Sequence, residues 1–351
     1  MRVLVAMSGG VDSSVAAALL AGSGSEVVGA TLKLWGGASD SGCCSVADVD
    51  DARRVADQLG IDHHVFTLTD DFDRAVVGPY VAAHAQGRTP NPCIECNRHI
   101  KFGVLAERAR RLGFDALATG HHARLAVSTR DGRVTLRRGA DRAKDQSYVL
   151  AMLGAGALRA VRLPIGALTK AEVRARAGAL GLRTADKPDS QDVCFIHSAT
   201  GRRAFLEERI DLHPASLVDA GTGGVVGEVP AGELVTVGQR RGLGVAVDGR
   251  RRYALAVDTA ARRITVGPAD QAVSCRLAVG GASWSGPALV PGARALAQTS
   301  AHAPAGAGRW LGDGVLFDQP QPLVAPGQTV AFYDPGDPDA VLGAATAGRA
   351  P

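Results

Sequence analysis

Two glycines, three serines and an aspartate are grouped in one short segment near the start of the chain. Residues 6–14 read AMSGGVDSS and lie between an apolar run and an apolar helical pattern. A glycine-rich turn from a buried strand into a helix aims backbone N–H groups at an anion, and the serine hydroxyls add donors. Asp12 would repel a phosphate unless a divalent cation lies between them. We expect a phosphate-binding loop, with Asp12 or Ser13 as the N-cap of the helix.

This loop differs from the common glycine motifs for phosphates. It lacks the Lys-Ser/Thr pair of a Walker A motif, and it is not G-x-G-x-x-G. The Ser-Gly-Gly-Val-Asp-Ser string instead resembles the pyrophosphate loop of the N-type ATP pyrophosphatases, which adenylate a substrate oxygen. The resemblance implies ATP and Mg²⁺ as cofactors. It leaves the substrate open, so another adenylating ligase of this superfamily is an alternative.

Two cysteines lie in polar, basic segments further along the chain. Cys96 stands in GRTPNPCIECNRHIKFG, where Pro90 and Pro92 predict a loop before the next helix. A helix start with Lys101 nearby would lower the pKa of the Cys96 thiol. Cys194 stands in DKPDSQDVCFIHS. A buried cysteine is usually a small hydrophobe, but these polar surroundings favour a chemical role.

Chain length, net charge and hydropathy limit the class of protein. The chain has 351 residues and a net charge of +4, which suits two or three domains and is compatible with nucleic acid without arguing for it. No apolar stretch approaches membrane-spanning length, and the first apolar run breaks at Ser8. We expect a cytoplasmic protein with no membrane partner and with reduced cysteines.

Strand and helix patterns alternate up to about residue 120, which predicts an α/β fold with a doubly wound parallel sheet. Ligands of such sheets bind at the carboxyl ends of the strands, where the loop, Leu32 and Gly120 are expected. The predicted strands are 2–7, 27–34, 63–68 and 115–119, and the predicted helices are 14–20, 46–59, 72–85 and 98–112.

The rest of the chain has a different pattern of secondary structure and composition. A helical hairpin is predicted at 163–182, with a capping box that begins at Thr169. Beyond residue 205, glycine and proline become frequent and short strands are predicted at 234–237, 253–257 and 263–266, followed by a β-barrel from about Val273. The expected domains are an ATP pyrophosphatase domain at 1–204, a small central domain at 205–270 and a C-terminal β-barrel at 271–351.

Eight motifs, in order along the chain, resemble those of the bacterial tRNA-specific 2-thiouridylases. They are Ser-Gly-Gly-Val-Asp-Ser, Gly87-Arg88-Thr89-Pro90-Asn91-Pro92, Cys96-Asn97, Ile100-Lys101-Phe102, Ala118-Thr119-Gly120-His121, Lys144-Asp145-Gln146-Ser147-Tyr148, Asp189-Ser190 with Cys194-Phe195-Ile196, and Gly238-Gln239-Arg240-Arg241-Gly242-Leu243-Gly244.

The resemblance implies a tRNA-uridine 2-sulfurtransferase. Members replace O2 of the wobble uridine, position 34, with sulfur in the tRNAs for Lys, Glu and Gln, after ATP has adenylated that oxygen. Cys194 would carry the sulfur as a persulfide, and Cys96 would be the nucleophile that leaves a transient Cys96–Cys194 disulfide. A cysteine desulfurase or a relay protein would supply the sulfur.

The resemblance also assigns binding residues by position. The expected ATP contacts are Ala6, Met7, Ser8, Gly9, Gly10, Val11, Asp12, Ser13, Leu32 and Gly120. The expected tRNA contacts are Asn91, Pro92, Cys93, His121, Lys144, Asp145, Gln146 and Gln328, of which the first three meet the target base. For His121, the role of a satisfied buried histidine stays open.

Two positions depart from the family pattern. The family usually has Asp where Cys93 stands, so three thiolates from Cys93, Cys96 and Cys194 could hold a [4Fe–4S] cluster that delivers sulfide without redox chemistry. This is an alternative to the persulfide. The family's Arg-Tyr pair for tRNA aligns to Ser300-Ala301, so that role is not carried over.

Overall fold

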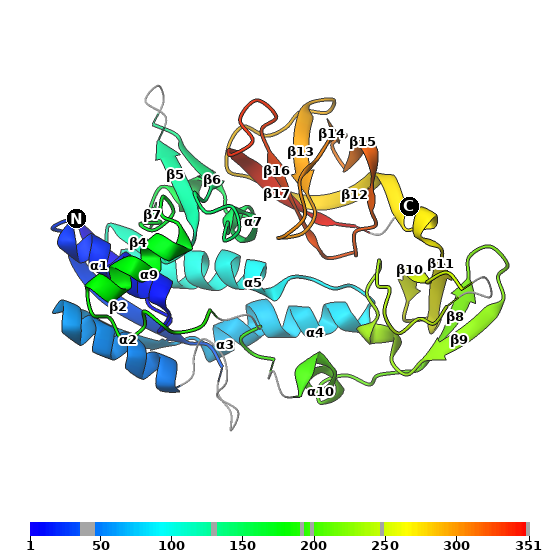
Figure 1. Cartoon of the computed structure of the whole chain (residues 1–351), viewed down its shortest axis with the longest axis horizontal. Coiled ribbons are helices and arrows are strands. Elements are labelled where there is room, and N and C mark those ends of the chain that lie inside the picture. Colours follow the sequence, from blue (N-terminus) through cyan, green and yellow to red (C-terminus); the bar gives the residue numbers. More distant parts are fainter. Residues whose placement is uncertain (36–45, 128–131, 190–192, 197–199, 246–248, 349–351) are drawn as a thin grey trace.

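The computed structural model describes residues 1–35, 46–127, 132–189, 193–196, 200–245 and 249–348. Figure 1 shows an α/β body around the N-terminus, a β-barrel beside it and a smaller sheet at the far end of the molecule. In the described part of the chain, no helix is both long enough and apolar enough to cross a membrane.

A five-stranded parallel sheet forms the centre of the N-terminal body, which confirms the predicted fold class. The order is β3-β2-β1-β4-β7, so the chain leaves β1 in one direction and later returns to pair β4 on its other edge. A ligand crevice is expected where the order reverses, at the carboxyl ends of β1 and β4. The bounds are β1 Arg2–Ala6, β2 Glu26–Lys33, β3 Asp62–Thr67, β4 Ala116–Thr119 and β7 Val161–Arg162.

Helices cover both faces of this sheet, because alternate residues of a strand point to opposite sides. Val3 and Val5 of β1 pack in a core with α1 (Val11–Gly22), α2 (Val46–Leu59) and α9 (Lys170–Ala179). Leu4, between them, belongs to the core on the other face.

Two long helices supply that second core. The first runs through α3 (Thr69–Phe72), a π-helical stretch (Asp73–Val77) and α4 (Gly78–Ala85). The second runs through α5 (Pro92–Glu95), a π-helical stretch (Cys96–Leu105) and α6 (Ala106–Arg111). Their buried side chains include Phe72, Ile100 and Leu105.

The second helix begins earlier than predicted. Proline at the first helical position loses no hydrogen bond, and the Asn91 side chain caps the helix by accepting the Cys93 amide at 3.0 Å. Pro92 therefore starts the helix and does not exclude it, and Cys96 lies one turn further in than expected. At α9 the predicted capping box of Thr169 and Glu172 is confirmed, but only Lys170–Ala179 of the hairpin predicted at 163–182 is α-helical.

Short elements connect the sheet to the rest of the chain. They are the hairpin β5 (Ala123–Val127) and β6 (Val134–Arg138), and the helices α7 (Ser147–Leu150), α8 (Ala155–Leu158) and α10 (Gly201–Glu207).

The last third of the chain is β-structure, as expected. A four-stranded sheet has the order β10-β11-β8-β9, and a closed barrel has the order β12-β15-β14-β13-β16-β17. The barrel begins at Val273, as predicted, whereas the strand predicted at 234–237 is wrong because a 3₁₀ turn, Gly232–Leu234, precedes a turn there. The strand bounds are β8 Ala215–Asp219, β9 Val225–Val229, β10 Tyr253–Asp258, β11 Arg263–Gly267, β12 Val273–Trp284, β13 Arg294–Gln298, β14 Gly306–Trp310, β15 Gly314–Pro322, β16 Thr329–Tyr333 and β17 Val341–Ala347.

Arginines of the β5–β6 hairpin hold the barrel against the N-terminal body. Arg138 lies 3.7 Å from the centre of the Tyr333 ring and pairs with Asp145 at 2.9 Å. Arg137 forms a two-bonded ion pair with Asp337, at 2.6 and 2.9 Å. Such planar, bidentate contacts fix orientation as well as distance.

The end of β4 packs directly on the start of α1. A Cβ at Gly120 would lie 2.5 Å from the Ser13 amide nitrogen and 2.6 Å from the Asp12 carbonyl carbon. Because both neighbours are backbone, neither can rotate away, so only glycine fits where the sheet meets the loop.

Gly120→Ala is expected to destabilise the protein by about 1–3 kcal/mol, since the extra methyl must displace α1. Gly178→Ala is the matched control: Gly178 lies inside α9, where a Cβ would meet open space, so alanine should stabilise by about 0.4–1 kcal/mol. Urea unfolding midpoints measure both. Equal midpoints for the two variants would contradict the close packing.

Candidate functional site

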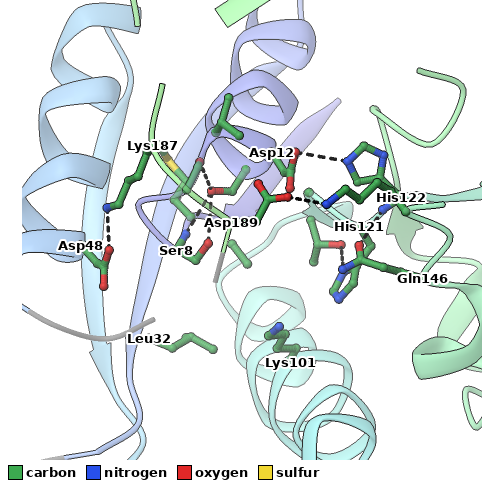
Figure 2. A pocket seen from close by; sticks show the side chains of 18 of the residues that line it. Ser8, Asp12, Leu32, Asp48, Lys101, His121, His122, Gln146, Lys187 and Asp189 are labelled. Atoms are coloured by element: carbon green, nitrogen blue, oxygen red, sulfur yellow. Dashed lines mark hydrogen bonds and ion pairs between the residues drawn. The ribbon is translucent and has the colours of Figure 1, made fainter. Parts of the chain in front are cut away.

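A cavity of about 370 Å³ opens at the carboxyl ends of β1, β2 and β4. Figure 2 shows side chains from the first loop, from β2 and from the second long helix converging on it. Nine of the ten residues expected to contact ATP line it, and the tenth, Gly9, lies within the same loop. Its volume falls in the range of small-molecule sites. The other lining residues are Ala30, Leu34, Asp48, Lys101, Thr119, His121, His122, Lys144, Gln146, Lys170, Lys187, Pro188 and Asp189.

The loop is held by its own hydroxyls. Gly10 is the N-cap of α1, so the prediction of Asp12 or Ser13 for that place is wrong. Ser13 Oγ donates to the Gly10 carbonyl at 3.1 Å and accepts the Ser8 amide at 3.2 Å. Ser14 Oγ donates to the same carbonyl at 2.9 Å. Ser13 and Ser14 therefore brace the loop, and their role as phosphate donors stays a prediction.

Gly9 provides the tight turn of the loop. Its φ is +69°, a conformation that favours glycine, and a Cβ there would overlap the backbone carbonyl of Asp48 on α2. The loop is thus clamped between α1 and α2.

Asp12 is contacted by two side chains, Lys170 and His122. Both of its oxygens lie 2.7 Å from Lys170 Nζ, and Oδ1 lies 3.2 Å from His122 Nε2. Burial alone would raise the pKa of Asp12, but hydrogen bonds and charge from His122 and Lys170 lower it overall. Asp12 is therefore an anion at neutral pH.

Asp189 contacts three cationic side chains, one from the loop after β6 and two from α9. It accepts from Lys144 at 2.7 Å, from Lys170 at 2.8 Å and from Arg174 at 3.0 Å. Burial opposes ionisation, but the lysine contacts lower the pKa of Asp189 to about 2. Asp189 precedes the segment that carries Cys194.

Lys187 ties the same segment to the loop. Its ammonium donates to the Gly9 carbonyl at 2.9 Å and pairs with Asp48 at 2.6 Å and Asp51 at 2.7 Å. The cavity is thus lined by four lysines and three aspartates. The lysines exceed the carboxylates, as an anionic ligand requires.

His121 lies at the back of the cavity as a neutral ring. It is 8% exposed and shares a 2.7 Å hydrogen bond with Thr119 Oγ1. Burial, followed by the charges of Lys101 and His122, moves the pKa of His121 well below its usual value. His121 is thus a buried histidine with a hydrogen-bond partner inside the protein, the alternative role that the sequence left open.

The other residues expected to contact tRNA are divided among several places. Gln146 lines the cavity and accepts the His122 amide at 2.8 Å. Asp145 is occupied by Arg138 and by two backbone amides, at 2.9 to 3.0 Å. Gln328, from the barrel, donates to the Thr89 carbonyl.

Pro92 lies apart from the first cavity. It lines a second cavity, of about 410 Å³, together with Pro90, Tyr80 and Gly327. Asn91 caps the helix that follows, so the three residues expected to meet the target base surround the start of that helix.

Ser300 and Ala301, the positions expected to align with the family's tRNA pair, follow strand β13. Their backbone carbonyls accept from Gln298 at 2.9 and 3.1 Å. A further cavity beside Ala301 is lined by Arg138 and Arg142, so the basic groups at this place come from the β5–β6 side.

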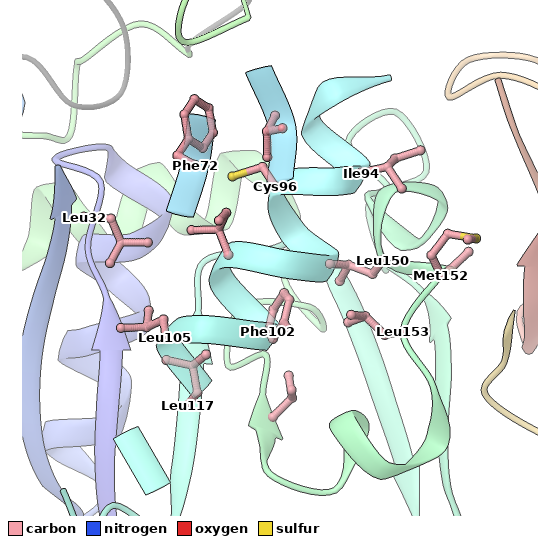
Figure 3. Packing of buried hydrophobic residues seen from close by; sticks show 14 of the residues in the cluster. Leu32, Phe72, Ile94, Cys96, Phe102, Leu105, Leu117, Leu150, Met152 and Leu153 are labelled. Carbon is pink, nitrogen blue, oxygen red and sulfur yellow. The ribbon is translucent and has the colours of Figure 1, made fainter. Parts of the chain in front are cut away.

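The three candidate cysteines differ in exposure. Cys93 is exposed, Cys96 is buried and Cys194 is half-buried. Figure 3 shows Cys96 pointing toward Phe72 in the core between the sheet and the helices. Cys194 packs against the same cluster.

Phe195 packs the segment 193–196, which contains Cys194, against the core. Its ring lies 5.7 Å from that of Phe72, 5.5 Å from that of Tyr80 and 5.1 Å from that of Phe205, centre to centre. Aromatic pairs at this spacing add to burial. Phe195 therefore holds its neighbour Cys194 against the core that contains Cys96.

Sequence reasoning missed Lys170, His122 and Asp48. The capping box placed Lys170 at the start of a helix, but nothing in the pattern joins it to Asp12, 158 positions away. Among the residues with described positions, no three His, Cys, Asp or Glu side chains are grouped as ligands for a metal ion.

Comparison with known proteins gives one consistent assignment. Residues 1–198 match the family model described as the tRNA methyl transferase HUP domain. The chain is 45% identical to the tRNA-specific 2-thiouridylase MnmA of Mycolicibacterium smegmatis, over 99% of this chain and 100% of that protein.

Two further relatives carry the same name. The enzyme of Chloroflexus aurantiacus is 46% identical over 95% of both chains, and that of Frankia alni is 48% identical over 81% of both. With identity at this level over almost its whole length, the chain belongs to the family of tRNA-specific 2-thiouridylases.

Proposed function

We propose that this protein thiolates C2 of the wobble uridine in the tRNAs for Lys, Glu and Gln, in the cytoplasm, by adenylation followed by persulfide transfer. One observation carries the proposal. Leu32 lines the anion cavity and also belongs to the buried cluster that contains Cys96 and touches Cys194. The proposed nucleotide site and the cluster of the two thiols therefore share this residue.

Adenylation would take place in the cavity. A uridine carbonyl oxygen is a poor leaving group, and its attack on the α-phosphate of ATP releases pyrophosphate and makes it a good one. The backbone N–H groups of the loop and the lysines would bind the departing pyrophosphate.

Mg²⁺ fits this site. Because it usually keeps several waters and takes only one or two carboxylates besides the phosphates, Asp12 with the ligand's own oxygens is sufficient. The ion would neutralise phosphate charge there.

Sulfur transfer would follow on the other side of Leu32. The outer sulfur of a Cys194 persulfide attacks C2, and AMP leaves with the former O2. The Cys96 thiolate then attacks the Cys194 sulfur, which releases 2-thiouridine and leaves a Cys96–Cys194 disulfide. A dithiol must return two electrons, and a desulfurase or relay protein must recharge Cys194.

The tRNA must present its base to this site. A uridine reaches buried thiols only if it is turned out of the stacked anticodon loop. Asn91, Pro92 and Cys93 stand at the helix start, one turn before Cys96. Lys144, and Arg138 and Arg142 beside Ala301, would contact phosphates of the tRNA.

An iron–sulfur route is disfavoured. It needs three thiolates around one cluster, and no such group of ligands occurs among the described residues. The exposed Cys93 and the buried Cys96 also differ in their access to a shared cluster.

The function is tested by returning variants to a strain that lacks this gene and measuring 2-thiouridine in bulk tRNA by mass spectrometry. The unaltered protein should restore it, whereas Cys96→Ser and Cys194→Ser should abolish it. Cys93→Ser should only reduce it, and Cys275→Ser, in the barrel strand β12, should match the unaltered protein.

Two results would contradict this account. Failure of the unaltered protein to restore 2-thiouridine would remove the proposed function. The second result is an equal loss of 2-thiouridine in the serine variants of all three candidate cysteines, together with about four irons per chain in protein purified without oxygen. It would favour a cluster over the persulfide.

Asp12→Asn is expected to lower tRNA-dependent pyrophosphate release by roughly 100-fold. The isosteric amide keeps the shape of the loop, but it loses the charge that positions Lys170. Asp313→Asn, on an exposed barrel turn, is the control. Pyrophosphate release is followed by a coupled enzymatic assay, and an unchanged rate in Asp12→Asn would contradict the assigned role of the loop.

A further inference from the structure

Lysine is rare in this chain, and its distribution is uneven. The sequence has 39 basic residues, of which only five, Lys33, Lys101, Lys144, Lys170 and Lys187, are lysines. Four of these five line the anion cavity, and none of the described residues that line it is an arginine. A chain that uses arginine almost everywhere else therefore has lysine at this site.

The two side chains differ in a way that bears on this choice. Arginine presents a planar fork that stays bidentate on one carboxylate or phosphate. An ammonium is a compact charge on a flexible stem, with three donors that can be shared among partners and redirected. A cavity lined with lysines suits a site where cations change partners.

Lys170 joins α9 to the first turn of α1 and to the segment that contains Asp189. It is 9% exposed and lies at the first position of α9, where the Thr169 capping box fixes the backbone. Its ammonium contacts both oxygens of Asp12 at 2.7 Å and one oxygen of Asp189 at 2.8 Å. Those three contacts use the three N–H donors of the ammonium.

The two carboxylates hold Lys170 unequally. Asp12 offers two oxygens, whereas Asp189 offers one and keeps Lys144 and Arg174 if Lys170 leaves. The contact with Asp189 is therefore the one that an incoming anion can replace at least cost. Exchange of a carboxylate for a phosphate oxygen leaves the charge of the ammonium compensated.

We propose that Lys170 binds the β- and γ-phosphates of ATP by exchanging Asp189 for phosphate oxygens while Asp12 holds its ammonium in place. The lysine that the loop lacks in comparison with a Walker A motif is thereby supplied from α9. This inference rests on the proposed use of ATP, and it adds the residue that recognises the polyphosphate.

The test measures binding of ATP and of AMP to the full chain by calorimetry, in EDTA so that no metal contributes. Lys170→Met should weaken ATP binding roughly 10- to 100-fold, as expected for the loss of a hydrogen bond to a charged group, and should leave AMP binding unchanged. Lys33→Met is the matched control, because Lys33 is exposed and is the one lysine outside the lining. It should not change either affinity.

Asp189→Asn should change the ATP affinity in the direction opposite to that expected if Asp189 had only a structural role. It removes the competitor for Lys170, so ATP should bind more tightly than to the unaltered protein, again without change for AMP. Thermal melting of each variant checks its fold.

Three outcomes overturn the inference: equal ATP affinity in Lys170→Met and the unaltered protein, equal loss for ATP and AMP, or weaker ATP binding in Asp189→Asn. Absence of ATP binding by the unaltered protein, both in EDTA and with Mg²⁺ added, would instead refute the proposed function on which the inference rests.

Discussion

The compensation of charge around Lys170 is the constraint on which the arrangement of this site depends. Its ammonium joins the first turn of α1, through Asp12, to the segment that leads to Cys194, through Asp189. A buried charge that loses its partner costs several kcal/mol, so the loop, α9 and that segment are held in a single arrangement. The same charges give the cavity its capacity for an anion.

The sheet topology supports the proposal that nucleotide and sulfur chemistry share a site. The reversal of strand order between β1 and β4 opens a crevice at their carboxyl ends. The helix that carries Cys96 contributes to a core that shares Leu32 with the lining of the cavity. Activation and replacement of one uridine oxygen require this closeness, because the adenylated base must not be released between the steps.

Much of this arrangement follows from sequence patterns. Strand and helix periodicity located the parallel sheet, and α2 was predicted with the bounds that it has, because apolar spacing is strong there. The Thr169 capping box and the start of the barrel at Val273 were also correct. These features are local, so neighbouring residues are enough to specify them.

The failures have physical reasons. Pro92 was taken to exclude a helix although proline suits a first helical position. Gly10 replaced the expected side-chain cap because the loop hydroxyls turn inward to its carbonyl. Lys170 could not be paired with Asp12 from sequence, since an ion pair across 158 positions leaves no periodic trace.

The fate of the uridine oxygen tests the central claim most directly. Transfer RNA labelled with ¹⁸O at C2 of the wobble uridine is incubated with the protein, ATP and a persulfide donor, and the AMP is analysed by mass spectrometry. If O2 is adenylated before sulfur replaces it, the label appears in AMP in proportion to the 2-thiouridine formed. Label released to water or found in pyrophosphate, with unlabelled AMP, would contradict adenylation of the base.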